Sequence, residues 1–231
     1  MAKKRGKLIV IDGSDGSGKA TQTRFLLARL KAEGYKTKTL DFPQYEENHF
    51  GRLIGRCLAG DFGDFIAIDP HIGSVLYAAD RFESRPKIER WLKAGYTIVL
   101  DRYVSANQIH QGGKIRDVKK QKEFLSWLDH MEHGVFGLPR PDVIVYLDVP
   151  VEVSQKLLGQ EEQQRKKVYL KKGQKDLAEM NVKHLSLSRE NALRLVNKLN
   201  RWARINCTAK GTMFSREAIA EKVWSAVTKA I

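Results

Sequence analysis

The sequence of 231 residues predicts an α/β fold in which a parallel sheet carries helices on both faces. Three observations lead to this prediction. Five short apolar runs are spaced along the chain, amphipathic segments of helical period lie between them, and glycine or proline marks many of their ends. Strands that alternate with helices in this way form parallel sheets, because each parallel connection crosses back through a helix.

The N-terminal half supplies two strands and two helices. The first helix carries apolar side chains at helical spacing, and Gly34 follows it as a stop signal. Gly95 ends the second helix in the same way. The expected order is a strand at Lys7–Asp12, a helix at Lys19–Glu33, a strand at Lys36–Phe42 and a helix at Gly73–Ala94.

The C-terminal half supplies three further strands and a last helix. The helix opens with Ser215 as a cap and has Glu217 in its first turn, where a negative charge is favourable. A polar, Lys-rich stretch at Glu161–Lys175 indicates a mobile surface insertion inside one domain that spans residues 1–231. The expected elements are strands at Tyr96–Leu100, Val143–Leu147 and Ala203–Cys207 and a helix at Ser215–Lys229.

Composition narrows the class of protein. Only Cys57 and Cys207 are present, far apart, which excludes a disulfide framework and a structural zinc site and favours a reducing, cytoplasmic location. Apolar runs of about five residues are too short for a membrane span or a signal peptide, so we expect a soluble protein with no membrane partner. The net charge of +14 fits either a nucleic acid or a small polyanion such as a nucleotide.

A glycine-rich motif lies between the first strand and the first helix. Its residues are Gly13, Ser14, Asp15, Gly16, Ser17, Gly18 and Lys19. A strand, this loop and a helix together are typical of a P-loop NTPase, in which backbone N–H groups and a lysine hold phosphates. The next residue is Ala20 where a magnesium-binding Ser or Thr is usual, and Thr21 lies one position further on. Magnesium is therefore expected to depend on phosphates, water and carboxylates from elsewhere.

Two other segments carry polar groups suited to a nucleotide. Asp101 and Arg102 follow a strand, at the sheet edge where ligands bind, so the aspartate can orient magnesium-bound water and the arginine a phosphate. Tyr77 and Arg81 are four residues apart and share a helix face, which suits a base and its polar edge. Each pair is also compatible with a purely structural role.

Taken together, the motifs resemble the thymidylate kinase family. Their order and spacing match from about Leu8 to the C-terminal helix. The resemblance implies a P-loop NTPase-type five-stranded sheet with a lid insertion, a homodimer, and transfer of a phosphoryl group from ATP with Mg²⁺ to dTMP. The segments that carry it are Ile11–Lys19, Phe42–Tyr45, Tyr77–Arg81, Asp101–Tyr103, Gln111–Gly113 and Gly137–Asp142.

The resemblance also implies a role for individual residues. Residues 13–21 would bind ATP, with Lys19, Asp101 and Arg102 catalytic and Asp101 at the magnesium ion. In the family, the acidic loop residue contacts the sugar 3′-hydroxyl, an aromatic stacks on thymine, and arginines bind the base and the acceptor phosphate. The positions implied for dTMP are Asp15, Phe42, Pro43, Tyr45, Tyr77, Arg81, Arg102, Asn107, His110 and Gln111.

The Lys-rich insertion matches the lid of the family, at about residues 158–180. Family members with glycine at the position of Gly16 supply the catalytic cation from the lid. Arg165 is the arginine within the basic stretch 165–175, so we assign it that role. Asp176 and Glu179 match acidic lid positions and are candidate magnesium ligands.

Two alternatives remain open at this stage. A related kinase could phosphorylate another nucleotide or a deoxynucleoside on the same scaffold. A nucleic-acid-binding module could use the positive charge, although the sequence has no recognisable helix-turn-helix, RNA-binding sheet or zinc motif.

Overall fold

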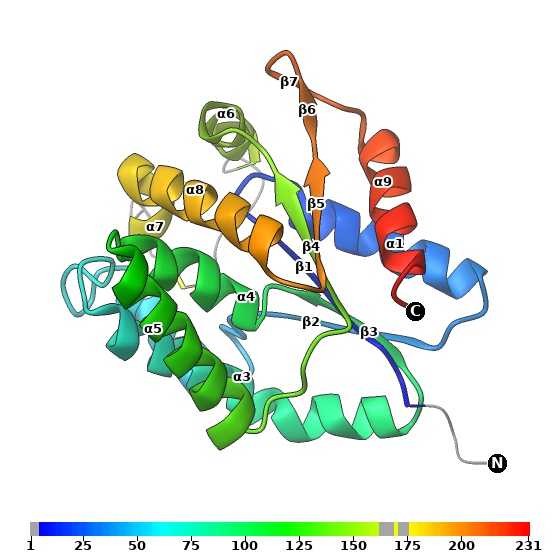
Figure 1. The fold of residues 1–231 in the computed structure, drawn as a ribbon, viewed down its shortest axis with the longest axis horizontal. Helices are drawn as coiled ribbons and strands as arrows, with labels where there is room; N and C mark the ends of the chain where they lie inside the picture. Colours follow the sequence, from blue (N-terminus) through cyan, green and yellow to red (C-terminus); the bar gives the residue numbers. More distant parts are fainter. Residues whose placement is uncertain (1–4, 162–168, 171–175) are drawn as a thin grey trace.

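A five-stranded parallel sheet forms the centre of the computed structural model, which describes residues 5–161, 169–170 and 176–231 (Figure 1). The strand order is β2-β3-β1-β4-β5. The strand bounds are β1 Leu8–Gly13, β2 Thr37–Asp41, β3 Thr97–Asp101, β4 Val143–Asp148 and β5 Trp202–Asn206. The predicted fold class and all five predicted strands are confirmed, and no strand end differs from its expected position by more than one residue.

Helices cover both faces of the sheet (Figure 1). The long helices are α1 Lys19–Ala32, α2 His49–Leu58, α3 Pro70–Lys93, α5 Val118–Asp129, α6 Val151–Glu161, α8 Val182–Lys198 and α9 Arg216–Thr228. The short segments are α4 Val104–Ala106, α7 Leu177–Met180, the π-helical turns η1 Asn107–Gln111 and η3 His130–Val135, the 3₁₀ turn η2 Gly112–Lys114, and a hairpin of β6 Thr208–Ala209 and β7 Thr212–Met213.

Alternation along the strands divides the core between the two faces. In β1, Ile9 and Ile11 pack into the layer of α1 and α9, whereas Leu8 and Val10 pack into the layer that includes α3. This period of two is what a strand buried on both faces requires. Because β1 is central, the loop that follows it lies over the middle of the sheet, between the ends of β3 and β4.

Helix ends explain where the structure departs from the expected bounds. We expected the second helix to begin at Gly73, but α3 begins at Pro70. The Asp69 side chain accepts a hydrogen bond from the His71 N–H at 2.8 Å, and proline is well suited to the first helical position. Ser215 caps α9 as predicted, through the Ala218 N–H. Within the described ranges, no helix combines the length and the apolar character needed to cross a bilayer.

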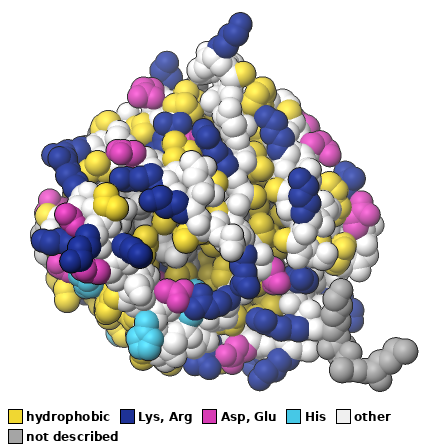
Figure 2. All heavy atoms as spheres, in the orientation of Figure 1, with side chains coloured by type: hydrophobic (Ala, Val, Ile, Leu, Met, Phe, Trp, Pro, Cys, Tyr) yellow, Lys and Arg dark blue, Asp and Glu magenta, His cyan; other side chains and the backbone are white. Residues whose placement is uncertain are grey.

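Charged side chains are mixed on the surface. Figure 2 shows Lys and Arg side chains spread over the visible face among Asp, Glu and apolar side chains. The net charge of +14 therefore does not gather into a single basic band on that face.

Candidate active site

The glycine-rich loop is tightly folded between β1 and α1. Gly18, at the start of α1, has a left-handed φ of 85°, and the Ser17 N–H donates to the Ser14 carbonyl at 3.1 Å. Lys19 is only 8 % exposed, and its Nζ donates to the Ser14 carbonyl at 2.9 Å. The lysine thus lies across its own loop, as a phosphate-binding lysine does.

The side chain of Asp12 links this loop to the segment that follows β3. It is fully buried at the end of β1; its Oδ1 accepts from the Gly13 N–H at 2.8 Å and its Oδ2 from the Ser105 hydroxyl at 2.6 Å. A buried carboxylate with two donors fixes both segments that it joins. Asp12 therefore fixes the position of the phosphate loop relative to α4, the short helix that follows β3.

Asp15 links the two cations of the site. Its Oδ1 lies 2.6 Å from Arg102 Nη2 and 3.4 Å from Lys19 Nζ. Lys19 comes from the loop after β1, and Arg102 follows β3 with a positive φ of 65°. The sequence predicted each of these three residues, and the structure brings them together at one carboxylate oxygen.

Charges of both signs meet at the strand ends. Burial raises the pKa of Asp101 to about 6, although Lys19 and Arg102 act against this shift. Burial alone would lower the pKa of Arg102, but the carboxylates of Asp15, Asp12 and Asp101 outweigh it and raise that pKa. Arg102 thus stays charged while it is shielded from water, a setting in which it binds a phosphate strongly.

His110 orients the guanidinium of Arg102. Arg102 Nη1 donates to His110 Nε2 at 2.8 Å, and His110 Nδ1 lies 3.2 Å from the Ser188 hydroxyl on α8. Burial, Arg102 and His184 lower the pKa of His110 well below its ordinary value, so the ring is neutral. Because Nε2 accepts, Nδ1 carries the proton and donates to Ser188. The sequence analysis placed His110 among the positions implied for dTMP but missed this contact.

An aromatic group lies on the acceptor side of the site. Tyr77 on α3 packs 5.9 Å from Phe65, and burial raises its pKa. The charges that act on its phenol include those of Asp176, Arg102 and Asp15. The Tyr45 ring lies 4.4 Å from that of Tyr169.

The segment before Tyr45 supports this aromatic group. Phe42 is buried and packs 6.0 Å from the ring of Tyr103, and a cis peptide bond joins it to Pro43. Tyr169 was not anticipated, because a tyrosine among lysines in a polar stretch gives no sequence signal of a docked ring.

A second group of polar side chains is buried where α3 meets η1. Arg81 and Asn107, both expected at the base, are each 2 % exposed and both contact Glu132, which is fully buried. Gln111 is 6 % exposed, and its Oε1 has no hydrogen-bond partner in the described part of the chain. Glu132 was missed by the sequence analysis, since a glutamate near the end of a helix normally faces solvent.

The lid assignments are only partly covered by the structure. Arg165 lies outside the described residues, as does the side chain of Glu179. Asp176 is buried; its Oδ2 accepts from the Tyr169 hydroxyl at 2.6 Å and its Oδ1 from the Ala178 N–H at 2.8 Å. Its assignment as a magnesium ligand, like those of Arg165 and Glu179, stays a prediction.

The donor set fits a magnesium ion that arrives with its nucleotide. Among the residues that the structure describes, no group of three or more His, Cys, Asp or Glu side chains is placed to hold a metal ion. Magnesium in kinases is held by one or two carboxylates and the substrate phosphates, so a cage of protein ligands is not required. Asp101, a hard oxygen donor whose pKa, raised by burial, is lowered in part by Lys19, is the candidate for that carboxylate.

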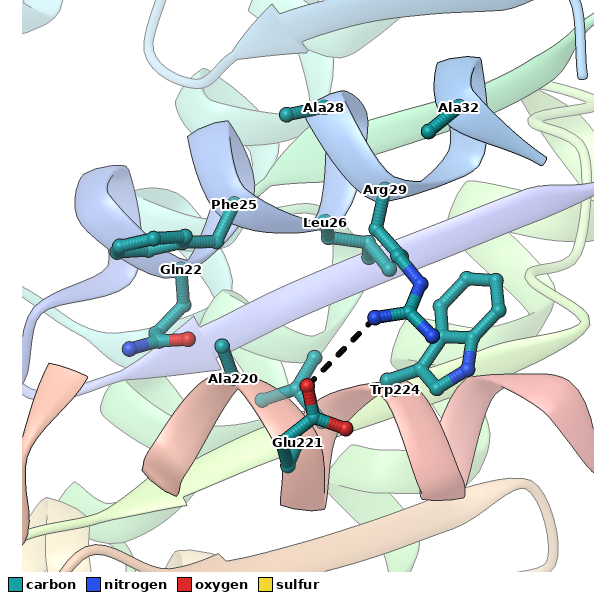
Figure 3. Close-up of a pocket in the computed structure, with 10 residues that line it drawn as sticks. Gln22, Phe25, Leu26, Ala28, Arg29, Ala32, Ala220, Glu221 and Trp224 are labelled. Carbon is teal, nitrogen blue, oxygen red and sulfur yellow. Dashed lines mark ion pairs between the residues drawn. The ribbon is translucent and has the colours of Figure 1, made fainter. Parts of the chain in front are cut away.

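A separate groove of about 300 Å³ runs between α1 and α9 (Figure 3). Its lining is largely apolar, with Arg29 paired to Glu221 at 3.6 Å and lying over the Trp224 ring at 5.1 Å. None of the predicted ATP or dTMP residues lines this groove, although α1 contributes both to the groove and to the phosphate loop. It is therefore distinct from the site at the strand ends.

Comparison with known proteins identifies the family. The family model described as thymidylate kinase matches residues 11–212. The chain is 32 % identical to thymidylate kinase of Homo sapiens over 149 residues, which are 64 % of each protein. It is 33 % identical to thymidylate kinase of Arabidopsis thaliana over 150 residues, 65 % of this chain and 51 % of that protein. The matched regions thus cover less than two thirds of these relatives.

The fold is also that of a solved family member. A structure of thymidylate kinase from Candida albicans superposes with a TM-score of 0.72 at 23 % identity, covering 97 % of this chain and 92 % of that one. The family model spans every motif that carried the resemblance. The chain belongs to the thymidylate kinase family.

Proposed function

We propose that this protein transfers the γ-phosphoryl group of ATP to dTMP, giving ADP and dTDP. The observation that carries the proposal is the meeting of Lys19 and Arg102 at Asp15. One cation comes from a loop built for a donor triphosphate and the other from the adjacent strand end. Two phosphate-binding groups from different strands, close enough to contact one oxygen atom, suit a transfer between two bound nucleotides.

The mechanism requires little covalent chemistry from the protein. The loop N–H groups and Lys19 hold the donor phosphates, and Arg102, oriented by His110, holds the acceptor phosphate in line with the γ-phosphoryl group. When the phosphates enter, they compete with Asp15 for both cations, which frees the carboxylate to meet the sugar of the acceptor. Charge that develops on the transferring group is stabilised by Lys19 and, in our assignment, by Arg165.

Magnesium would be held by the phosphates, by water and by Asp101. It would neutralise the charge on the β- and γ-phosphates and orient them for transfer. Asp176 and Glu179 are further candidate ligands. The protein's own part is to keep Asp101 beside Lys19, which the pairing of β1 with β3 does.

The residues on the acceptor side determine which nucleotide is phosphorylated. Tyr77, Arg81 and Asn107 favour a pyrimidine, with the ring stacking and the two polar groups meeting its edge. The related structure from Candida albicans is described as revealing the origin of broad substrate specificity in that enzyme. Other deoxynucleoside monophosphates are therefore the second acceptor class to test.

We further propose that residues 1–231 form one domain, that the protein acts in the cytoplasm and that it is a homodimer. Cys57 and Cys207 are both unpaired, which is usual for reducing compartments. On α3, Ile72 is 66 % exposed and Val75 is 42 % exposed, with Phe82 further along the helix at 45 %. Apolar side chains exposed together along one helix are typical of an interface.

The test is an acceptor panel with purified protein, ATP and Mg²⁺, in which ADP release is measured with dTMP, dUMP, UMP, dCMP and thymidine. We expect the highest kcat/KM with dTMP and no reaction without an acceptor. Thymidine as the preferred acceptor would instead indicate a deoxynucleoside kinase. If no acceptor reacts and the protein binds DNA or RNA tightly in a gel-shift titration at two salt concentrations, the kinase proposal is wrong.

A further inference from the structure

A fully buried carboxylate, paired with a buried arginine, lies beside the residues assigned to the acceptor base. Glu132, in the π-helical turn η3, is 0 % exposed and contacts two side chains assigned to the acceptor base. We propose that Glu132 is a positioning residue that sets the hydrogen-bonding edge offered to the acceptor base and so selects an imide pyrimidine over cytosine. This inference rests on the proposed function and names the determinant of its base choice.

The first step is the pairing with Arg81. Arg81 Nε donates to Glu132 Oε2 and Arg81 Nη2 to Glu132 Oε1, both at 2.7 Å. The guanidinium is planar, so this contact uses one of its edges completely. Nη1 lies on the other edge, and its N–H groups are the donors that remain for a ligand.

The second step is the orientation of the Asn107 amide. Asn107 Nδ2 lies 2.8 Å from Glu132 Oε1 and 3.0 Å from the Ser74 carbonyl oxygen. Both neighbours can only accept, because one is an ionised carboxylate and the other a carbonyl. The NH₂ end of the amide must therefore face them, and Oδ1 is the end left for a ligand.

These two constraints define a recognition edge with one donor and one acceptor. Arg81 offers an N–H and Asn107 offers an oxygen. Thymine and uracil present the complementary pair, the O4 acceptor and the N3–H donor. Cytosine presents an amino donor at C4 and an unprotonated N3, so it would place a donor against Arg81 and an acceptor against Asn107. A buried donor that faces a donor, or a buried acceptor that faces an acceptor, weakens binding strongly.

The backbone shows why this arrangement depends on Glu132. Asn107 begins the π-helical turn η1, and Glu132 lies within the second one, η3. Such turns insert an extra residue and redirect side chains, and they are frequent at functional sites. Glu132 also brings together positions 51 and 25 residues away in sequence, on α3 and η1. A role confined to core packing would not require three donors to converge on one carboxylate.

The experiment compares Glu132→Gln with the wild type on dTMP, dUMP and dCMP. The glutamine keeps the volume but places an NH₂ group against the donors, so Arg81 loses its ion pair and the Asn107 amide loses one of the two acceptors that fix it. We expect KM for dTMP and dUMP to rise by about tenfold or more while KM for ATP stays within about twofold. The kcat/KM ratio of dTMP to dCMP should fall by about tenfold or more, because a turned Asn107 donates to cytosine N3.

The matched control is Asp129→Asn, which breaks a bidentate pair of the same chemistry. Arg140 contacts both Asp129 oxygens, at 2.6 and 2.7 Å, on the exposed side of the same segment of chain. This variant should keep the wild-type ratio of dTMP to dCMP. If Glu132→Gln lowers activity on all three acceptors by one common factor, or leaves the ratio unchanged, the inference is wrong.

If Glu132→Gln does not fold, a second variant tests the inference. Loss of one partner of a buried pair is more destabilising than replacement of both. The double variant Arg81→Met with Glu132→Leu removes both charges together and should fold without preference for dTMP over dCMP. A double variant that keeps the preference overturns the inference. A wild type that accepts none of the three nucleotides instead overturns the proposed function, a result that is separate from any change in the ratio.

Discussion

Single charged side chains decide how the two nucleotides would be held. Lys19 and Arg102 contact the same oxygen of Asp15, but one belongs to the donor side and the other to the acceptor side. Their removal should therefore have different kinetic signatures. Lys19→Ala should lower kcat with dTMP by about 10²-fold or more, the scale of a lost transition-state donor. Arg102→Ala should chiefly raise KM for dTMP and leave KM for ATP unchanged.

Arg29→Ala serves as the control for this pair. Arg29 is on the same helix as Lys19 but pairs with Glu33 at the surface, with 48 % of its side chain exposed. Steady-state kinetics of all three variants would check the assignment. Wild-type constants in Lys19→Ala, or a raised ATP KM alone in Arg102→Ala, would contradict it.

The raised pKa of Asp101 predicts how the stability of the protein depends on pH. Its pKa in the folded protein, about 6, is above its ordinary value, so the folded state binds more protons than the unfolded state between about pH 4 and 6. Stability contributed by this group is then present at low pH and lost as pH rises towards 6. Asp101→Asn should be more stable than the wild type at pH 7–8, by on the order of 2–3 kcal/mol, and equal to it near pH 4.

Urea unfolding of both proteins across this pH range measures the difference. The comparison isolates Asp101 from the buried histidines, which are present in both proteins. His184, with a pKa lowered to about 4 by burial, destabilises both proteins equally as the medium becomes acidic. A constant difference between the two proteins from pH 4 to 8 would show that the carboxylate is not perturbed.

The candidate site residues that sequence could predict are those carried by local patterns. Lys19 and Asp15 belong to one loop, and Arg102 follows its strand directly. The residues that orient the side chains of the site come from distant parts of the chain. Glu132 is 51 residues from Arg81, and Ser188 is 78 residues from His110. No periodicity within one segment reports such contacts, because they exist only once the helices pack.

At the scale of elements, α2 holds the segment Phe42–Tyr45 in place through a close approach of backbones. A Cβ on Gly51 would lie 2.0 Å from the Gln44 carbonyl oxygen. Gly51→Ala must therefore push α2 away from this segment, at a cost of about 1–3 kcal/mol. Since Phe42 and Tyr45 belong to the acceptor side, KM for dTMP should rise while KM for ATP is unchanged.

Thermal unfolding and kinetics of Gly51→Ala would check this prediction. Arg56→Ala, on the same helix with 61 % of the side chain exposed, should stay within about 0.5 kcal/mol of the wild type. An equal loss in the two variants would mean that α2 is merely weakened as a helix.

Three helices were predicted from signals at their ends. Gly34 and Gly95 marked the ends of α1 and α3, and Ser215 marked the start of α9. Helices α2, α5, α6 and α8 were not anticipated. The core side chains of α5, Phe124 and Leu128, lie in its second half, after a Lys-rich first half, and α8 follows the polar insertion directly. Asp117 caps α5 and Asn181 caps α8, two signals that the sequence analysis missed, and α8 packs against η1 and η2.

At the scale of the whole molecule, the exposed apolar side chains of α3 predict a dimer. Wild-type protein should have about twice the mass of the 26.3 kDa chain in light scattering. A charge at the centre of such an interface is costly, so Ile72→Glu with Val75→Glu should give a monomer. Val182→Glu, at a residue of α8 that is 50 % exposed, should remain dimeric. A monomeric wild type would contradict the prediction.

The order of the strands was beyond what the sequence alone could define. Alternation of strands and helices predicted a parallel sheet, but it does not state which strand lies beside β1. The structure places β3 and β4 on its two sides. That order brings Arg102, at the end of β3, next to the loop after β1, so the site depends on the topology as much as on the motifs.

Gly16 restricts how this catalytic site could change in evolution. It has a φ of 76°, and a Cβ there would lie 2.3 Å from the Ser154 carbonyl oxygen and 2.9 Å from the Leu158 side chain, both on α6. An arginine at this position would be strained in its backbone and would collide with α6. A lineage could not gain a cation in the loop by one mutation while α6 stays where it is. Any such change would first require α6 to be rebuilt, so the loop and the helix that leads into the lid are expected to diverge together.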